Sequence, residues 1–311
     1  MAEASYLEKL NARLALGVAR LPEDLLAPVR SFVITSQRAD GGFAGREGES
    51  DLYYTSFGLR GLAITGALKR PVCDKAAGFL RVRLGRPASA IDFVSLLYAS
   101  RLIHAGGGPD VLAENSPDWA DRVAATLERH RSADGGYAKN AGGPMGSTYH
   151  TFLVAVAYGL IGRPLPMPER VIELLRSRRR DDGGFVELAV MKRSGVNPTA
   201  AAVALARMLG DNGELTRGAV DCLLALQSPE EGGFCANRSM PVADLLSTFT
   251  ALVTLRDLGV SERVNRDGAR AFVRLLVTPA GGFRAGVWDD QPDVEYTFYG
   301  LGALALIEEG A

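Results

Sequence analysis

The chain has 311 residues, of which 47% are hydrophobic and 23% charged, and its formal net charge is −1. A hydrophobic share of this size can bury a full core, which argues against a disordered chain. The balanced charge argues against a nucleic-acid binder. No apolar stretch approaches the ~18–20 residues of a membrane helix, and the first residues lack the profile of a signal peptide. We therefore expect a soluble, cytoplasmic protein without a membrane span.

Residues 1–26 are predicted to form a helical extension that packs outside the rest of the fold. After them a glycine pair followed by an aromatic residue recurs, and the last four copies are 48, 49 and 49 residues apart. The first gap, of 94 residues, is close to two periods, so a degenerate unit without the glycines is expected over residues 70–105. Six such units predict one repeat domain over residues 27–311. The copies are Gly41-Gly42-Phe43, Gly135-Gly136-Tyr137, Gly183-Gly184-Phe185, Gly232-Gly233-Phe234 and Gly281-Gly282-Phe283.

Each unit is predicted to contain two helices of different character. Residues 168–176, before one glycine pair, place apolar side chains on one face and charges on the other. The glycines end this helix because glycine adopts positive φ without steric cost. Residues 199–210, after the loop, are apolar on nearly every side, so the second helix must be covered all round.

Outer amphipathic helices around inner apolar ones predict an all-α fold, and six such pairs can close into an α/α barrel. An open solenoid is the alternative, but it requires polar-faced end caps. The last unit ends in the apolar run 301–306, which is a poor cap. We therefore favour the closed ring.

In such a ring, all loops between a glycine pair and the next inner helix open on one end. Asp51, Asp244 and Asp293 each stand four residues before a recurring threonine, in units one, five and six, which are neighbours once the ring closes. Three convergent carboxylates could hold a divalent cation or raise the pKa of one of them for acid catalysis. Capping of the helix is the alternative for each. The threonines are Thr55, Thr151, Thr199, Thr248 and Thr297, with Ser95 as the counterpart in the degenerate unit.

Cations and aromatic residues accompany these acids. Arg and Lys beside helix N-termini suit an anionic group such as a phosphate, although solvation is the simpler alternative for each charge. Aromatic rings at the starts of the inner helices could line an apolar lumen for a greasy chain or a carbocation, and core packing is their alternative. The loop cations are Arg46, Lys139, Lys192, Arg193, Arg238 and Arg284, and the lumen candidates are Tyr54, Tyr149, Phe152, Phe249, Tyr296 and Tyr299.

These repeats resemble the prenyltransferase and squalene-cyclase repeat superfamily over about residues 27–308. They are most similar to the β subunit of protein prenyltransferases of the Rab geranylgeranyltransferase (type II) kind. The resemblance implies an α/α barrel that binds an isoprenoid diphosphate, farnesyl or geranylgeranyl, in an aromatic lumen. It also implies a zinc ion, held by Asp, Cys and His, that activates an acceptor thiol, and an α-subunit partner.

The family residues are only partly present. Asp244 matches the zinc-binding Asp, but Leu246 and Tyr296 stand where the family has Cys and His. One Asp cannot hold zinc, and a carboxylate set suits magnesium better; a thiolate displaced to Cys235 is an alternative. Asp293 keeps an acidic position of the family. The resemblance further implies diphosphate binding by Arg238, which matches a family Arg, and by Arg193, which stands near a family His; the neighbouring Lys192 is added to them as a loop cation.

The sequence therefore predicts a prenyltransferase-like protein that binds an isoprenoid diphosphate and transfers or processes its prenyl group. Arg238, Arg193 and Lys192 would stabilise the departing diphosphate. Asp244, Asp293 and Asp51 would hold a cation or orient an acceptor. A terpene-cyclase-like enzyme, with one of these Asp as proton donor, is the first alternative, although the acid motif Asp-x-Asp-Asp of cyclases is absent. A non-catalytic isoprenoid-binding or scaffold protein is the second.

Overall fold

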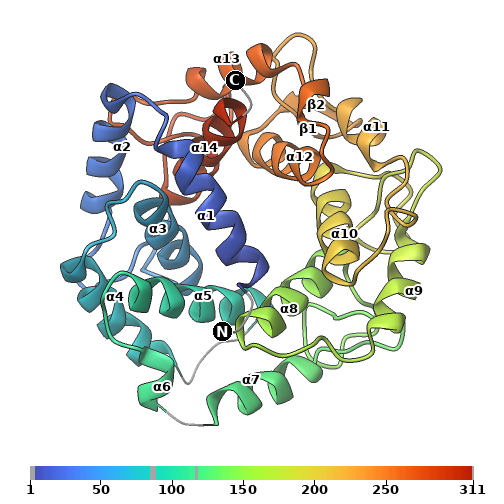
Figure 1. The fold of residues 1–311 in the computed structure, drawn as a ribbon, viewed down its shortest axis with the longest axis horizontal. Coiled ribbons are helices and arrows are strands. Elements are labelled where there is room, and N and C mark those ends of the chain that lie inside the picture. The colour runs from blue at the N-terminus through green and yellow to red at the C-terminus, as the bar shows by residue number, and fades with distance from the viewer. Residues whose placement is uncertain (1–3, 85–88, 116–117, 310–311) are drawn as a thin grey trace. The chain divides into compact units, whose positions relative to one another are not determined.

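The computed structural model describes residues 4–84, 89–115 and 118–309, and these are mostly helical (Figure 1). The chain divides into two compact units. Unit 1 comprises residues 1–123 and 273–309, and unit 2 comprises residues 124–272. None of the helices in the described ranges has the length and hydropathy needed to cross a bilayer.

Unit 1 contains the first and last repeats. Two helices, α7 and α13, continue across the division between the units. The elements are α1 (Tyr6–Val18), α2 (Glu23–Thr35), α3 (Leu52–Ile64), α4 (Arg70–Arg83), α5 (Ala90–Ala105), α6 (Val111–Asn115), α7 (Trp119–Glu128), α13 (Arg266–Leu275) and α14 (Val294–Glu308).

Unit 2 contains the middle repeats and the two strands found in the described part of the chain, which pair antiparallel. Its inner helix α10 packs against both α8 and α12. The elements are α8 (Thr148–Leu160), α9 (Pro168–Arg178), α10 (Val196–Met208), α11 (Ala219–Leu224), β1 (Cys235–Asn237), β2 (Met240–Ala243), α12 (Leu245–Asp257) and the 3-10 helix η1 (Ser261–Arg263).

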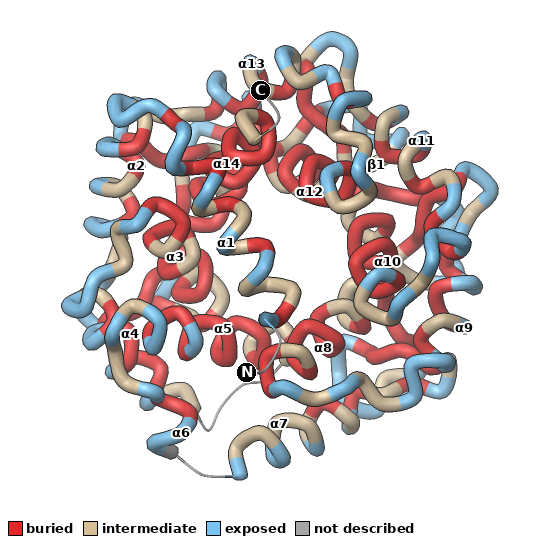
Figure 2. The backbone as a smooth tube through the Cα atoms, in the orientation of Figure 1, coloured by how far each residue is buried: buried red, intermediate tan, exposed pale blue. Residues whose placement is uncertain are grey.

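The predicted alternation of outer and inner helices is confirmed. In chain order the described residues give the pairs α2–α3, α4–α5, α7–α8, α9–α10, α11–α12 and α13–α14, and α4–α5 occupies the predicted degenerate unit. The second helix of each pair is buried over most of its length, and Figure 2 shows α10, α12 and α14 largely in red. The first helix buries one stripe, which in α9 consists of Val171, Leu174, Leu175 and Arg178.

The recurring motif joins each repeat to the next. The backbone N–H of the aromatic residue donates to the hydroxyl of the recurring threonine at 2.9–3.0 Å in all five copies. The first glycine has positive φ and lies against the backbone of the following outer helix. A methyl group on Gly281 would overlap the carbonyl oxygen of Pro28 in α2, so the last repeat packs on the first within unit 1.

Two local predictions are wrong. In the degenerate unit Ser89 caps α5, so the position four residues after the cap is Phe93 rather than Ser95. Helix α1 does not pack outside, because it contacts the inner helices α14 and α3. The close approach of Gly17 to Ala305 has no room for a side chain. The predicted division into residues 1–26 and 27–311 stays a prediction.

Candidate functional site

A cationic pocket lies in unit 2, between the loop that joins α9 to α10 and the β1–β2 hairpin. Its volume is about 360 Å³. The three residues predicted to bind a diphosphate, Lys192, Arg193 and Arg238, all line it, and all are exposed. The other lining residues are Asp182, Ser194 and Ser239.

The hairpin positions Arg238 and Ser239 at its turn. Asn237 pairs with Met240 across the two strands, and the side chain of Asn237 accepts a 2.8 Å hydrogen bond from the Ser239 N–H. The Arg193 guanidinium donates to the Ser239 hydroxyl, which ties the α9–α10 loop to the hairpin. Gly195 lies so close to the Ala236 carbonyl that a Cβ there would be 2.9 Å from its oxygen.

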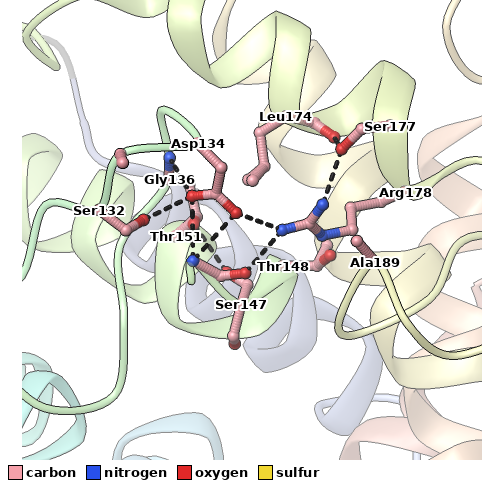
Figure 3. A network of polar contacts seen from close by, with 12 residues as sticks. Ser132, Asp134, Gly136, Ser147, Thr148, Thr151, Leu174, Ser177, Arg178 and Ala189 are labelled. Carbon is pink, nitrogen blue, oxygen red and sulfur yellow. Dashed lines mark hydrogen bonds and ion pairs between the residues drawn. The ribbon is translucent and has the colours of Figure 1, made fainter. Parts of the chain in front are cut away.

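Asp182, the acid that lines the pocket, is hydrogen-bonded to residues of its own loop. Its carboxylate accepts from the Ser194 hydroxyl at 2.6 Å and from the Gly184 N–H at 3.0 Å. Asp134 closes the preceding repeat in the same way, through Ser132, Gly136 and Gly146 (Figure 3). The pocket therefore presents three cations and one carboxylate that is already hydrogen-bonded, which suits an anion rather than a cation.

The three candidate catalytic aspartates all cap helices. Asp51 and Asp293, in unit 1, accept from the N–H groups of Tyr54 at 2.7 Å and of Tyr296 at 2.8 Å. Asp244, in unit 2, accepts from both the N–H and the hydroxyl of Ser247 at 2.7 Å. Capping is thus confirmed for each, and the convergence of the three stays a prediction.

Burial raises the pKa of all three carboxyl groups above the ordinary value for aspartate, and the capping hydrogen bonds counteract it only in part. For Asp293 the rise in pKa is also reduced by Arg46, whose Nε lies 3.3 Å from the Asp293 Oδ2. The same guanidinium pairs with the buried Asp289. Burial would raise the pKa of Asp289, but hydrogen bonds from Ala285 and Arg46 bring it below its usual range.

The residues present do not fit the zinc site that the resemblance implies. Both oxygens of Asp244 accept hydrogen bonds from Ser247, and the neighbouring Leu246 has no donor atom for a metal. Burial raises the pKa of Cys235, which favours the thiol over the metal-binding thiolate. Across the described ranges, no three His, Cys, Asp or Glu side chains are grouped so that they could hold one metal ion.

The lumen candidates fall into both units. In unit 1 Tyr299 contacts Tyr296 and Phe57, with ring centroids 6.1 and 5.2 Å apart in edge-to-face geometry. Burial and the nearby acids raise the pKa of Tyr54 to about 12. In unit 2 the rings of Tyr149 and Phe152 are 6.5 Å apart on α8, and Phe249 is buried on α12.

Glu295 is a candidate that the sequence reasoning missed. It is only 9% exposed, on the apolar helix α14, and its Oε1 accepts from the Tyr53 hydroxyl at 2.5 Å and the Tyr299 hydroxyl at 3.2 Å. Burial, reinforced by repulsion from Asp293, raises its pKa. An acid in the first turn of a helix that is otherwise apolar and aromatic up to Ile307 was the signal in the sequence that could have found it.

Solved structures with similar folds catalyse different reactions. Protein geranylgeranyltransferase-I of Candida albicans, complexed with GGPP, is 14% identical with a TM-score of 0.70, over 90% of each chain. A variant of the type II terpene cyclase MstE from Scytonema, with geranylgeranyl dihydroxybenzoate as substrate, is 14% identical with a TM-score of 0.66, over 97% of this chain and 99% of that one. A glycosidase variant is 12% identical with a TM-score of 0.57, over 96% of this chain and 97% of that one. These likenesses concern the fold alone.

The family comparison is more specific. None of the curated proteins compared by sequence matches the chain. The family model of the prenyltransferase alpha-alpha toroid domain matches residues 26–90, 101–240 and 212–310, which together span most of the chain. This match confirms the predicted all-α toroid fold and the predicted superfamily. The chain belongs to the prenyltransferase alpha-alpha toroid domain family.

Proposed function

We propose that this protein binds an isoprenoid diphosphate and transfers or processes its prenyl group. The observation that carries the proposal is the pocket in unit 2, because it groups Lys192, Arg193 and Arg238 around one space. The relative from Candida albicans is complexed with GGPP, a ligand that joins an anionic diphosphate to an apolar chain. Farnesyl and geranylgeranyl diphosphate are therefore the ligands to test first.

The pocket residues would act on the leaving group. When the bond to the prenyl carbon breaks, negative charge grows on the diphosphate, and fixed cations stabilise it. The two arginines can each offer a planar pair of N–H donors, whereas Lys192 offers a compact charge. The Arg193 bond to Ser239 would be exchanged for bonds to the ligand.

The remaining assignments follow from the same proposal. Aromatic rings exclude water and stabilise an allylic cation, a task we assign to the six lumen candidates named above. Asp51 and Asp293 in unit 1 and Asp244 in unit 2 would each orient an acceptor from the position where it caps its helix; a magnesium ion held by the three together is not supported by the described residues. Protein as the acceptor, an α-subunit-like partner, a type II β-subunit-like role and a cytoplasmic location are all part of the proposal.

Calorimetric titration with farnesyl and geranylgeranyl diphosphate tests the proposal. We expect micromolar or tighter binding, and Arg238→Ala should weaken it by about 1–3 kcal/mol, the contribution of a charged hydrogen bond. Arg176→Ala, which removes an exposed arginine of α9 outside the pocket lining, is the matched control and should bind as the wild type does. If neither diphosphate binds, the proposal is wrong and the alternative of a non-catalytic scaffold protein is favoured.

Glu295 favours a second candidate, a terpene cyclase that starts by protonation. Burial raises the pKa of this carboxyl group, so it is a stronger proton acceptor and is more readily protonated than an ordinary glutamate, and the rings of Tyr53 and Tyr299 contact it through their hydroxyls. Incubation with geranylgeranyl dihydroxybenzoate, the substrate bound to the MstE variant, should then give a cyclised product that Glu295→Gln abolishes. An unchanged substrate, or a product that survives in Glu295→Gln, would contradict this candidate.

A further inference from the structure

Exposed apolar side chains flank the cationic pocket of unit 2 on both of its walls. In the α9–α10 loop, Val190 is 72% exposed and Met191 47%. In strand β2, Met240 is 58% exposed and Val242 45%. Exposed apolar groups gathered at one polar-rimmed site mark an interaction surface rather than ordinary scatter.

The backbone holds these side chains outward. The Arg180 guanidinium donates to the carbonyl oxygens of Ala189 and Met191, each at 2.8 Å, and so fixes the segment that carries Val190 and Met191. Met240 is fixed by its pairing with Asn237 across the hairpin. Neither apolar pair is thus free to fold back onto the protein without breaking hydrogen bonds.

Within the two segments 190–193 and 238–242, every charged residue is a cation. Lys192 and Arg193 directly follow the first apolar pair, and Arg238 lies two residues before Met240. The loops that carry the two segments also contain acids outside them. Glu187 accepts from the Ser147 hydroxyl and Glu231 from the Ala243 N–H at 2.8 Å, whereas Asp181 and Glu230 are exposed. The excess of positive charge within the two segments contrasts with a net charge of −1 for the whole chain.

We propose that residues 190–193 and 238–242, which we call the docking rim, seat this protein on an anionic phospholipid bilayer. A bilayer interface accepts apolar side chains at the acyl boundary and cations at the phosphates, and it requires no complementary shape. The interleaving of apolar and cationic residues within each segment matches that arrangement. A ligand with an anionic head and a greasy tail would reside in the same interface, directly before the pocket.

The docking rim shares its cations with the pocket, but its apolar members lie outside the pocket lining. The two proposals can therefore fail separately. Val190→Ser/Met191→Ser should weaken vesicle binding and leave the binding of soluble farnesyl diphosphate within about twofold. Arg193→Ala should weaken both, and the loss on vesicles should be about fivefold, as expected for one cation at a charged membrane surface.

The experiment is co-sedimentation of the full chain with sucrose-loaded vesicles. Vesicles of equal parts phosphatidylcholine and phosphatidylglycerol should bind the protein, and added salt should weaken this binding. Vesicles of phosphatidylcholine alone should bind it much less. Val190→Ser/Met191→Ser should reduce the partition coefficient about tenfold. Val82→Ser, which replaces a valine 68% exposed on α4, is the matched control and should have no effect.

Three results would overturn the proposal: no binding to the anionic vesicles, equal binding to the neutral ones, or equal losses in Val82→Ser and Val190→Ser/Met191→Ser. Vesicle binding without farnesyl diphosphate binding would sustain the docking rim and remove the proposed function. Farnesyl diphosphate binding without vesicle binding would do the reverse.

Discussion

In unit 1 the aromatic cluster lies beside buried acids and beside Arg46 and Arg60, which lie over its rings, whereas in unit 2 three exposed cations gather at the pocket. Burial raises the pKa of Glu295 and Asp293, so these acids are more readily protonated than ordinary carboxyl groups. Within one repeat pattern, unit 1 thus places acids of raised pKa beside aromatic rings, and unit 2 gathers cations that can attract an anion.

Unit 2 also buries one cation, and removal of this cation should give the largest effect on stability. Arg178 is 2% exposed, and its Nη2 contacts Asp134 at 2.6 Å and the Gly146 carbonyl at 2.9 Å (Figure 3). Arg178→Met should lower the free energy of unfolding by about 3 kcal/mol, because it leaves Asp134 without its cation. Urea unfolding measures this loss.

Arg176→Ala serves as the control for that measurement, since Arg176 is exposed on the same helix. It should change the free energy of unfolding by less than about 0.5 kcal/mol. An equally small loss in Arg178→Met would show that the buried pair contributes no more than the packing that replaces it.

Replacement of the buried Glu295 in unit 1 should change the free energy of unfolding less than Arg178→Met does, and in the opposite direction. Glu295→Gln keeps the shape and a hydrogen-bond acceptor for Tyr53 but removes a buried charge, so it should stabilise the fold by about 1 kcal/mol at neutral pH. Because the pKa of Glu295 is raised in the fold, wild-type stability should fall as the pH rises through that raised pKa.

Below the ordinary pKa of a glutamate, both variants are uncharged at this position and their unfolding midpoints should agree. Thermal unfolding of the two proteins across this pH range tests the sign. A difference that widens toward acid pH would contradict the assignment of a raised pKa to Glu295.

The repeat architecture could be predicted because its causes are local. A buried aromatic residue, a glycine with positive φ and a threonine that bonds back to the aromatic N–H leave a mark in every unit that contains all three. The degenerate unit lacks these residues, and there the position of Ser95 was misassigned by two residues relative to the cap at Ser89. The motif therefore predicts the repeat only in units whose residues make these contacts.

The other misses concern how elements pack and which atoms a side chain contacts. An amphipathic helix can cover either face of its neighbours, so the sequence of α1 could not tell that it lies against α14 and α3. Tyr299 lies one helical turn after Glu295, so its contact could be read from the spacing, whereas only the fold brings the Tyr53 hydroxyl from α3 to this carboxylate. Arg193 and Arg238 could be predicted because the family resemblance supplied the spacing that joins two distant loops, and Lys192 followed as the cation next to Arg193.

The contact between Gly281 and Pro28 repeats, at the meeting of the last and first repeats, the packing found where Gly232 approaches Gly268 between consecutive repeats. The last and the first repeats of the described residues therefore meet at a joint that is built like the others. A circularly permuted chain that links the present termini and opens at another joint would keep every one of these glycine contacts. The order in which the repeats are translated is thus separable from the packing that holds them together.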